Sequence, residues 1–485
     1  MKFSITSVLS FMALAASANA ALNPIEVKGN AFYDSVSGSR FYIRGVDYLP
    51  GGASNFTDPL SSSDTCTRDI EYFKELGINT IRVYSVDNSA DHKDCMEKLD
   101  DAGIYLILDV NTPKNSISRS DPQVSYNTAY LQHVFATIDA FASYDNVLGF
   151  FAANEVINNE NTTQAAPYVK AVVRDMKTYM AAQNLRAIPV GYSAADISAN
   201  RYQQIQYFNC GDDETARIDM FGMNDYSWCG NSSYTVSGYD QKVEQYSNYT
   251  RPLFLSEFGC NKVEPRPFGE IESIYSTNMT GVFSGGLVYE YSEEENNYGL
   301  VSISSSGTIT EKQDFVNLKN AFASVSDPSG DGGAKDDDSP AVCPEMEEGV
   351  WEVNPLAGLP VMPERASAML VSGAGDPSGT NEPPTQYGDS GDQSDDSNWD
   401  YSPTTAAASG SSTSSGSSSS SASSGSSASS GSSSSSSASG SATSKSAANP
   451  GAVNNLPSMT SSVVMLPLAV IVSSLLFGFA SVVVV

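Results

Sequence analysis

The chain has 485 residues, and its 56 aspartates and glutamates against 26 lysines and arginines give a formal net charge of −30. So acidic a chain is not expected to bind nucleic acid, because phosphate contacts need a basic surface. Its two histidines, His92 and His133, lack the spacing of a metal site, which also disfavours a Ser-His-Asp triad. No glycine loop for phosphates or dinucleotides occurs, and we expect neither a metal nor a cofactor.

Residues 1–20 predict a secretory signal. Lys2 is the charged start, residues 5–16 form an apolar run, and Ala18 and Ala20 flank a cleavage site. The alternative is a buried N-terminal helix, which is disfavoured because the stretch is short and opens the chain. A secreted glycoprotein also fits five glycosylation sequons. The sequons lie at Asn55, Asn161, Asn231, Asn248 and Asn278.

Residues 22–325 have the length and the pattern of one α/β barrel. Short apolar runs without a helical period alternate with segments that can form helices. The eight runs are residues 41–48, 80–84, 105–110, 147–155, 187–193, 220–226, 252–259 and 285–291, and helices are expected at 67–76, 126–144, 165–182 and 313–323. This order predicts a (β/α)8 TIM barrel over residues 21–330, although other α/β folds share the alternation.

Polar and aromatic residues end most of these runs. In a parallel barrel all strand ends face one side, where such enzymes keep their active site. The residues expected there are Asp47, Tyr48, Arg82, Tyr84, Asp109, Asn111, Asn154, Glu155, Tyr226, Glu257, Tyr289, Glu290 and Tyr291. Tyrosine offers a flat face and a hydroxyl to a sugar ring. The candidates for substrate contact are Tyr48, Tyr84, Tyr226, Tyr289 and Asp109, with packing in the wall as the alternative for each tyrosine.

Two glutamates stand out among these strand ends. Asn154 and Glu155 close the fourth run, and Glu257 lies near the end of the seventh. A glutamate that ends an apolar strand is costly unless it is paired or protonated, and two on one barrel rim can act as the acid and the nucleophile of glycosidic-bond chemistry. One of the two must be protonated and the other ionised, and we expect the amide of Asn154 to bind the sugar 2-hydroxyl. The alternative is structural: a loop cap at Glu155, and Glu257 paired with Arg82.

Residues 331–405 form an acidic transition with 16 acidic and two basic residues, for which we expect a poorly ordered linker tied down at residues 343–351. A Ser/Ala/Gly tract over residues 406–448 follows, which cannot build a core and is typical of an O-glycosylated stalk. Residues 449–485 end in an apolar tail, preceded by the small residues Ser446, Ala447 and Ala448. This pattern predicts a glycosylphosphatidylinositol (GPI) anchor signal that is removed, with a single membrane helix as the alternative.

Several motifs together resemble the fungal GPI-anchored β-1,3-glucanosyltransferases of glycoside hydrolase family 72. They are Gly45-Val-Asp-Tyr48, Asn79-Thr-Ile-Arg-Val-Tyr84, Ile107-Leu-Asp-Val-Asn111, Asn154-Glu155, Gly222-Met-Asn-Asp-Tyr-Ser-Trp-Cys229, Ser256-Glu-Phe-Gly-Cys260 and Leu287-Val-Tyr-Glu-Tyr291. The resemblance covers about residues 22–350. It implies that Glu155 is the acid/base and Glu257 the nucleophile, and we then expect burial and the Glu257 charge to keep Glu155 protonated. The glucose-binding residues that it implies are Tyr84, Asn154, Tyr226 and Tyr289.

The resemblance further implies a monomer that elongates cell-wall glucan, cutting a donor chain internally and joining it to an acceptor chain. It implies the disulfides Cys66–Cys95, Cys210–Cys343 and Cys229–Cys260. Two features depart from many members: Leu49 replaces a glutamine, and Cys343 is the only cysteine after Cys260, so no cysteine-rich carbohydrate-binding domain is expected. A retaining endo-β-1,3-glucanase and a non-enzymatic wall glycoprotein are the competing hypotheses.

Overall fold

The computed structural model describes residues 21–52, 56–380 and 383–388. The predicted secretory signal, the sequon at Asn55, the serine-rich stalk and the anchor signal with Ser446, Ala447 and Ala448 lie outside these residues. Within the described part, no helix has both the length and the apolar character needed to cross a membrane.

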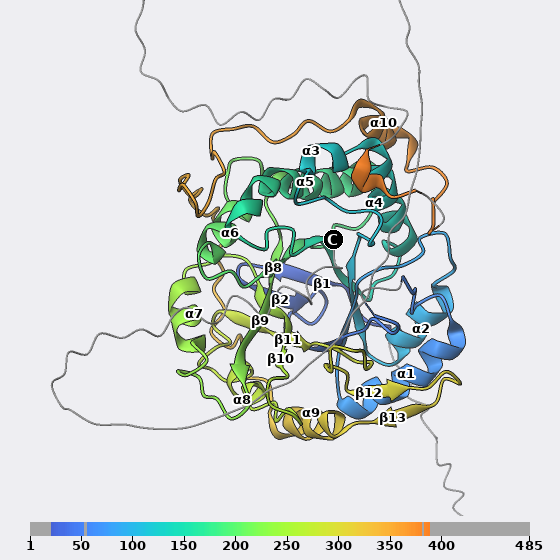
Figure 1. The fold of residues 1–485 in the computed structure, drawn as a ribbon, viewed down its shortest axis with the longest axis vertical. Coiled ribbons are helices and arrows are strands. Elements are labelled where there is room, and N and C mark those ends of the chain that lie inside the picture. Colours follow the sequence, from blue (N-terminus) through green and yellow to red (C-terminus); the bar gives the residue numbers. More distant parts are fainter. Residues whose placement is uncertain (1–20, 53–55, 381–382, 389–485) are drawn as a thin grey trace, which may run out of the picture. The chain divides into compact units, whose positions relative to one another are not determined.

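A closed barrel of eight parallel strands forms the centre of the described chain (Figure 1). The strands are β4 Ile43–Asp47, β5 Thr80–Val83, β6 Tyr105–Asp109, β7 Val147–Asn154, β8 Val190–Ala195, β9 Met220–Cys229, β10 Leu253–Cys260 and β11 Phe283–Val288. Each strand pairs with its chain neighbour and β11 closes onto β4. The predicted (β/α)8 barrel is therefore confirmed, and its strands are continuously apolar because they are covered on both sides.

Helices surround the barrel, and four of them match expected segments. These four are α1 Ser63–Leu76, α4 Thr128–Phe141, α5 Ala166–Ala182 and α9 Gln313–Ser324. Shorter helices that the sequence did not single out are α2 Lys93–Asp101, α3 Pro122–Ser125, α6 Arg201–Phe208, α7 Tyr239–Tyr246 and α8 Glu270–Ile274. Local signals set the ends of α1: Ser62 caps its first turn, and Gly77 ends it with a left-handed φ of 72°.

The end of the barrel at which the strands begin is closed by an antiparallel sheet. Its strands are β1 Ile25–Lys28, β2 Ala31–Asp34 and β3 Arg40–Phe41. Phe32 of this sheet is fully buried, and its ring lies 5.9 Å from that of Phe254, which stacks in turn on Phe151. Apolar side chains thus fill the barrel interior from this end. The polar ends of the strands are left at the opposite rim, where an active site is expected.

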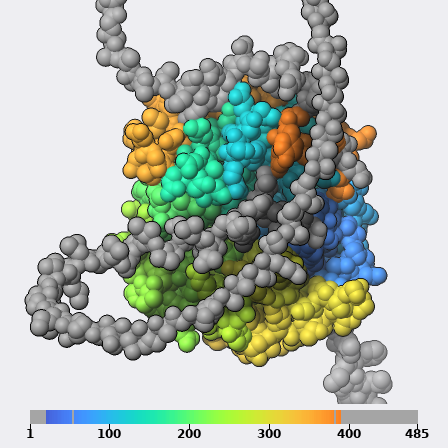
Figure 2. All heavy atoms as spheres, in the orientation of Figure 1, coloured from blue at the N-terminus to red at the C-terminus, as the bar shows by residue number. Residues whose placement is uncertain are grey.

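Parts of the segment 331–380 pack on the barrel, within and beyond the stretch 343–351 that was expected to be tied down. Trp351 is fully buried, with its ring 5.5 Å from that of Tyr207. Helix α10 (Glu364–Ser372) packs against α4 and α5, as Figure 1 shows, and in Figure 2 orange residues of the C-terminal segment lie beside cyan and teal ones. A few apolar residues in an acidic stretch anchor it, and residues 389–405 lie outside the described chain.

The remaining elements are β12 Val301–Ile303, β13 Ile309–Glu311 and the 3-10 turns η1 Glu160–Ala165, η2 Glu214–Ala216 and η3 Thr385–Tyr387.

The structure has the three disulfides that the resemblance implied. Cys66–Cys95 joins α1 to α2, and Cys229–Cys260 joins the ends of β9 and β10. Cys210–Cys343 ties the C-terminal segment to the chain after α6. Each of the four predicted sequon asparagines in the described chain is exposed to solvent.

Candidate active site

Glu257 lies inside strand β10, and its carboxylate receives three hydrogen bonds. The hydroxyl of Tyr84 donates to Oε1 at 2.8 Å and that of Tyr226 donates to Oε2 at 2.7 Å. Arg82 donates to Oε1 at the longer distance of 3.4 Å. The residue as a whole is only 7% exposed. Donors on both oxygens fix the orientation of this carboxylate and favour its ionised form.

Burial opposes ionisation at the same position. Desolvation and the nearby Glu155 charge raise the pKa of Glu257 to about 7, while Arg82, Tyr226 and Tyr84 lower it. The pKa of Glu257 thus depends on the charge of the neighbouring Glu155. The site therefore both stabilises and penalises the charge of the Glu257 carboxylate, a balance that is typical of catalytic carboxylates.

Glu155 directly follows the last residue of β7 and has a left-handed φ of 49°. This conformation is uncommon for a residue with a side chain and persists only where the surroundings fix it. Its backbone N–H donates to the carbonyl of Ser193 at 2.8 Å, and its carboxylate accepts from Asn224 Nδ2 at 2.9 Å. The side chain is partly exposed, which leaves it open to exchange of a proton.

Asn224 on β9 orients the Glu155 side of the site. Its Oδ1 accepts hydrogen bonds from Ser256 at 2.7 Å and from Ser193 at 3.1 Å. These bonds direct its amide Nδ2 toward Glu155 and toward Asn154 Oδ1, 3.2 Å away. Asn224 lies within the motif of residues 222–229, but no role was predicted for it. The signal was its position two residues before Tyr226, on the same face of the strand.

Arg82 is fully buried and connects four of the barrel strands. It forms a two-point ion pair with Asp109, with both distances 2.9 Å, and donates to Asn154 Oδ1 at 3.0 Å. Both carboxylate oxygens of Asp109 are thus occupied by Arg82. Asp109 holds that guanidinium in place and does not make the contact with substrate that was predicted for it. Asn154 accepts through Oδ1, so its NH2 group is the one that can meet a sugar hydroxyl. The alternative pairing of Glu257 with Arg82 is present, but only as the longer contact beside Asp109.

Four tyrosines form an aromatic wall beside the glutamates. The ring of Tyr289 lies 6.5 Å from Tyr84, 6.4 Å from Tyr226 and 5.3 Å from Tyr298. Each of the four is partly exposed, as a sugar-binding surface requires. Tyr298 was missed because it lies in the loop after β11, beyond any strand end.

Tyr48 does not belong to this wall, and its predicted contact with substrate is wrong. Its side chain is 1% exposed, and its hydroxyl donates to Asp69 of α1. Its ring packs on Phe73 of α1, 5.1 Å away. Successive strand residues point to opposite faces, and Tyr48 points outward to the helix layer.

The two histidines are buried packing residues. His92 Nε2 lies 2.7 Å from a carboxylate oxygen of Asp58, and His133 lies on α4 beside Asn88. Burial lowers the pKa of His133 to about 4. In the described part of the chain no group of histidine, cysteine and carboxylate side chains is arranged to hold a metal.

Comparisons with known proteins agree with this geometry. A family model described as glucanosyltransferase, of glycoside hydrolase family 72, matches residues 14–326. The 1,3-beta-glucanosyltransferase GAS5 of Saccharomyces cerevisiae is 63% identical over 367 residues, which cover 76% of this chain and 75% of that protein. The 1,3-beta-glucanosyltransferase gel1 of Aspergillus fumigatus is 56% identical, over 73% of this chain and 77% of its own.

A solved structure gives the same fold. Gas2p of Saccharomyces cerevisiae, in complex with laminaritriose and laminaritetraose, superposes with a TM-score of 0.66 at 41% sequence identity. The match covers 71% of this chain and 78% of Gas2p.

Proposed function

This chain belongs to the glucanosyltransferases of glycoside hydrolase family 72, and we propose that it cuts β-1,3-glucan internally and joins the new reducing end to the non-reducing end of another chain. The arrangement of Glu257 under three donors, beside a second and more exposed glutamate, carries the proposal. The names of the relatives and the oligosaccharides bound to Gas2p support the substrate class.

The reaction is a retaining double displacement. The Glu257 carboxylate attacks the anomeric carbon while Glu155 gives its proton to the leaving glycosidic oxygen, so that one C–O bond forms as another breaks. The reducing-side fragment then departs. Glu155, now ionised, takes the proton of an incoming sugar hydroxyl, whose oxygen displaces Glu257 and restores both carboxyls.

Transfer requires that an acceptor sugar outcompete water for the intermediate. Water is present at roughly 55 M and an acceptor at about millimolar concentration, a ratio of about 10⁴ that corresponds to roughly 5–6 kcal/mol. Stacking on the aromatic wall can supply about 0.5–1.5 kcal/mol for each ring. Tyr226, Tyr289 and Tyr298 are the rings that we assign to this task.

The function is tested by incubating the soluble protein with a reduced laminari-oligosaccharide and sizing the products. Products longer than the substrate support the transferase. Products that are only shorter support the endo-glucanase instead, and an unchanged substrate leaves the non-enzymatic wall glycoprotein. Glu257→Gln is the matched control, since it keeps the size of the side chain and removes the nucleophile.

We place the mature protein at the cell surface, as a monomer held to the plasma membrane by a GPI anchor that replaces the tail within residues 449–485. The support is the sequence pattern of the two ends and the exposed sequons. Phosphatidylinositol-specific phospholipase C should release the protein from intact cells. A protein that detergent releases but the phospholipase does not would be held by a membrane helix instead.

A further inference from the structure

The backbone carbonyl of Glu155 has a partner that the proposed mechanism does not use. Arg119, in the loop between β6 and α3, donates through Nη2 to this carbonyl at 2.9 Å. The backbone N–H of Glu155 donates to the carbonyl of Ser193. Two residues further along the chain, the N–H of Ile157 donates to the hydroxyl of Tyr192 at 3.0 Å. The left-handed turn at Glu155 is thus held from both sides, with Arg119 as its charged contact.

The loop that carries Arg119 is itself fixed by other parts of the chain. The Ser118 N–H donates to Ser125 Oγ of α3 at 2.8 Å. Residues of η3 bind the earlier part of the loop: the Thr385 N–H donates to the Lys114 carbonyl at 3.0 Å, and the Gln386 amide donates to the Pro113 carbonyl at 3.2 Å. These hydrogen bonds hold in place the loop that carries Arg119.

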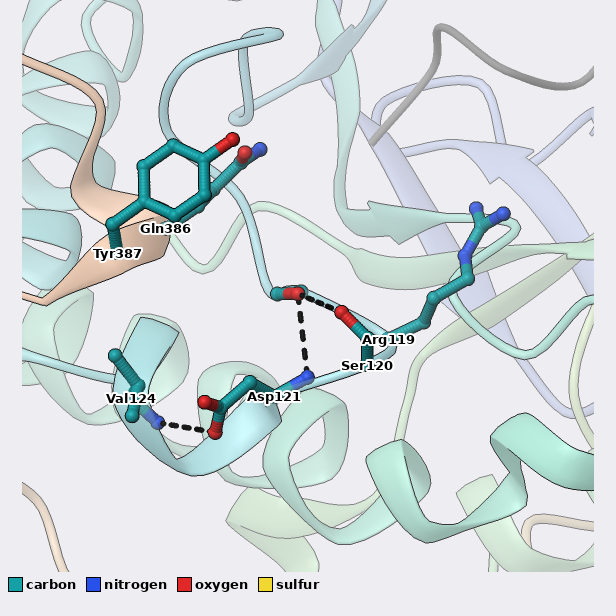
Figure 3. Close-up of a pocket in the computed structure, with 7 residues that line it drawn as sticks. Arg119, Ser120, Asp121, Val124, Gln386 and Tyr387 are labelled. Atoms are coloured by element: carbon teal, nitrogen blue, oxygen red, sulfur yellow. Dashed lines mark hydrogen bonds between the residues drawn. The ribbon is translucent and has the colours of Figure 1, made fainter. Parts of the chain in front are cut away.

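A cavity of about 480 Å³ lies between this loop and η3. Figure 3 shows that the Arg119 side chain extends away from Gln386 and Tyr387, toward the strands of the barrel. The guanidinium is thus directed to the end of β7, where Glu155 lies, and not to the residues of η3.

From this geometry we propose that Arg119 is a positioning residue for the acid/base. By holding the Glu155 carbonyl it fixes the left-handed backbone, and the backbone fixes where the carboxyl stands between Asn224 and the leaving oxygen. The inference rests on the proposed function, because it takes Glu155 as the proton donor. A group that positions an acid affects a reaction only where protonation of the leaving group is needed.

Leaving-group dependence tests this role. The probes are phenyl and 2,4-dinitrophenyl β-laminariosides, whose cleavage through the first step is reported by kcat/KM. Dinitrophenolate leaves without a proton, whereas phenolate needs one. Arg119→Met should lower kcat/KM on the phenyl substrate by about 10- to 100-fold and that on the dinitrophenyl substrate by less than about threefold. Arg119→Lys, which keeps the charge and a donor, should recover part of the loss.

Two controls separate this inference from folding and from the function itself. Lys114→Met removes a contact of the same loop with the Thr380 carbonyl and should leave the ratio of the two substrates unchanged. Equal losses on both substrates, or no loss on either, with Arg119→Met would overturn the inference. Glu155→Gln is the reference: if it too lost both substrates equally, the acid/base assignment would fail, and the inference with it.

Discussion

The two glutamates of the site have unlike surroundings. Glu257 lies within a strand, is 7% exposed and is bonded on both oxygens by tyrosine hydroxyls. Glu155 lies one residue beyond its strand, is partly exposed and has a left-handed backbone. The difference matches their tasks. A nucleophile must be held still against one carbon, whereas an acid/base must exchange protons with a departing and then an arriving oxygen.

The largest expected effect is the loss of activity when Glu257, the proposed nucleophile, is replaced. Glu257→Gln should lower kcat/KM by about 10⁴-fold or more on every donor, because no leaving group can replace the missing attack. Glu155→Gln should lose comparable activity on glucan but keep most of it on a dinitrophenyl donor. Rates on both donors measure this, and a Glu257→Gln enzyme that stayed active on the good leaving group would reverse the assignment.

The tyrosine donors of Glu257 should show the next largest effect. Tyr84→Phe and Tyr226→Phe each remove one hydrogen bond to a carboxylate, worth about 1.5–3 kcal/mol, or roughly 10- to 100-fold in kcat. Tyr298→Phe is the matched control, since its ring lies in the same wall while its hydroxyl is not bonded to Glu257. Equal losses in all three variants would mean that the hydroxyls do not act through their hydrogen bonds to Glu257.

The pH dependence sharpens the comparison further. Glu257 must be ionised to attack, so activity should fall as the pH drops through its pKa, which burial and the Glu155 charge raise to about 7. Glu155→Gln removes that charge and should move this acidic limb to lower pH. Profiles of kcat/KM on a dinitrophenyl donor measure the shift, and a limb that moved upward would contradict the coupling of the two groups.

The smallest expected effect concerns stability. Burial and the Glu294 charge raise the pKa of Glu290 to about 8 from its ordinary 4.5. The folded protein then binds more protons than the unfolded chain between these values, so the free energy of unfolding should fall as the pH rises from about 5 to about 8. Glu290→Gln should flatten this fall in urea unfolding. An unfolding free energy that rose over the same range would contradict the burial of these carboxyls.

The sequence predicted the barrel and its two glutamates because both depend on local patterns. Continuous apolar runs that end in polar residues mark strands and place their ends on one rim. It failed where long-range packing decides. Tyr48 and Asp109 stand at strand ends like Tyr84, yet one points outward to Asp69 and the other is held by Arg82.

Two further features could not be predicted in full from the sequence: the packing of the C-terminal segment on the barrel, and which of the two glutamates is the more buried. The stretch 343–351 was expected to be tied down, but the buried Val353 and Ala366, which anchor the acidic chain beyond it, were not predicted. We expected Glu155 to be buried, but Glu257 is the more buried of the two, because Tyr84, which directly follows β5, and Tyr226 of β9 close over its carboxylate. No local pattern encodes such contacts between distant strands.

The central claim is that Glu257 is the nucleophile of a covalent intermediate, and trapping tests it most directly. A 2,4-dinitrophenyl 2-deoxy-2-fluoro-β-laminarioside forms the intermediate readily and slows its breakdown. After proteolysis, mass spectrometry should find the fluorosugar on the peptide that contains Glu257. A label on Glu155 or another residue, or no label while the dinitrophenolate is still released, would contradict the account.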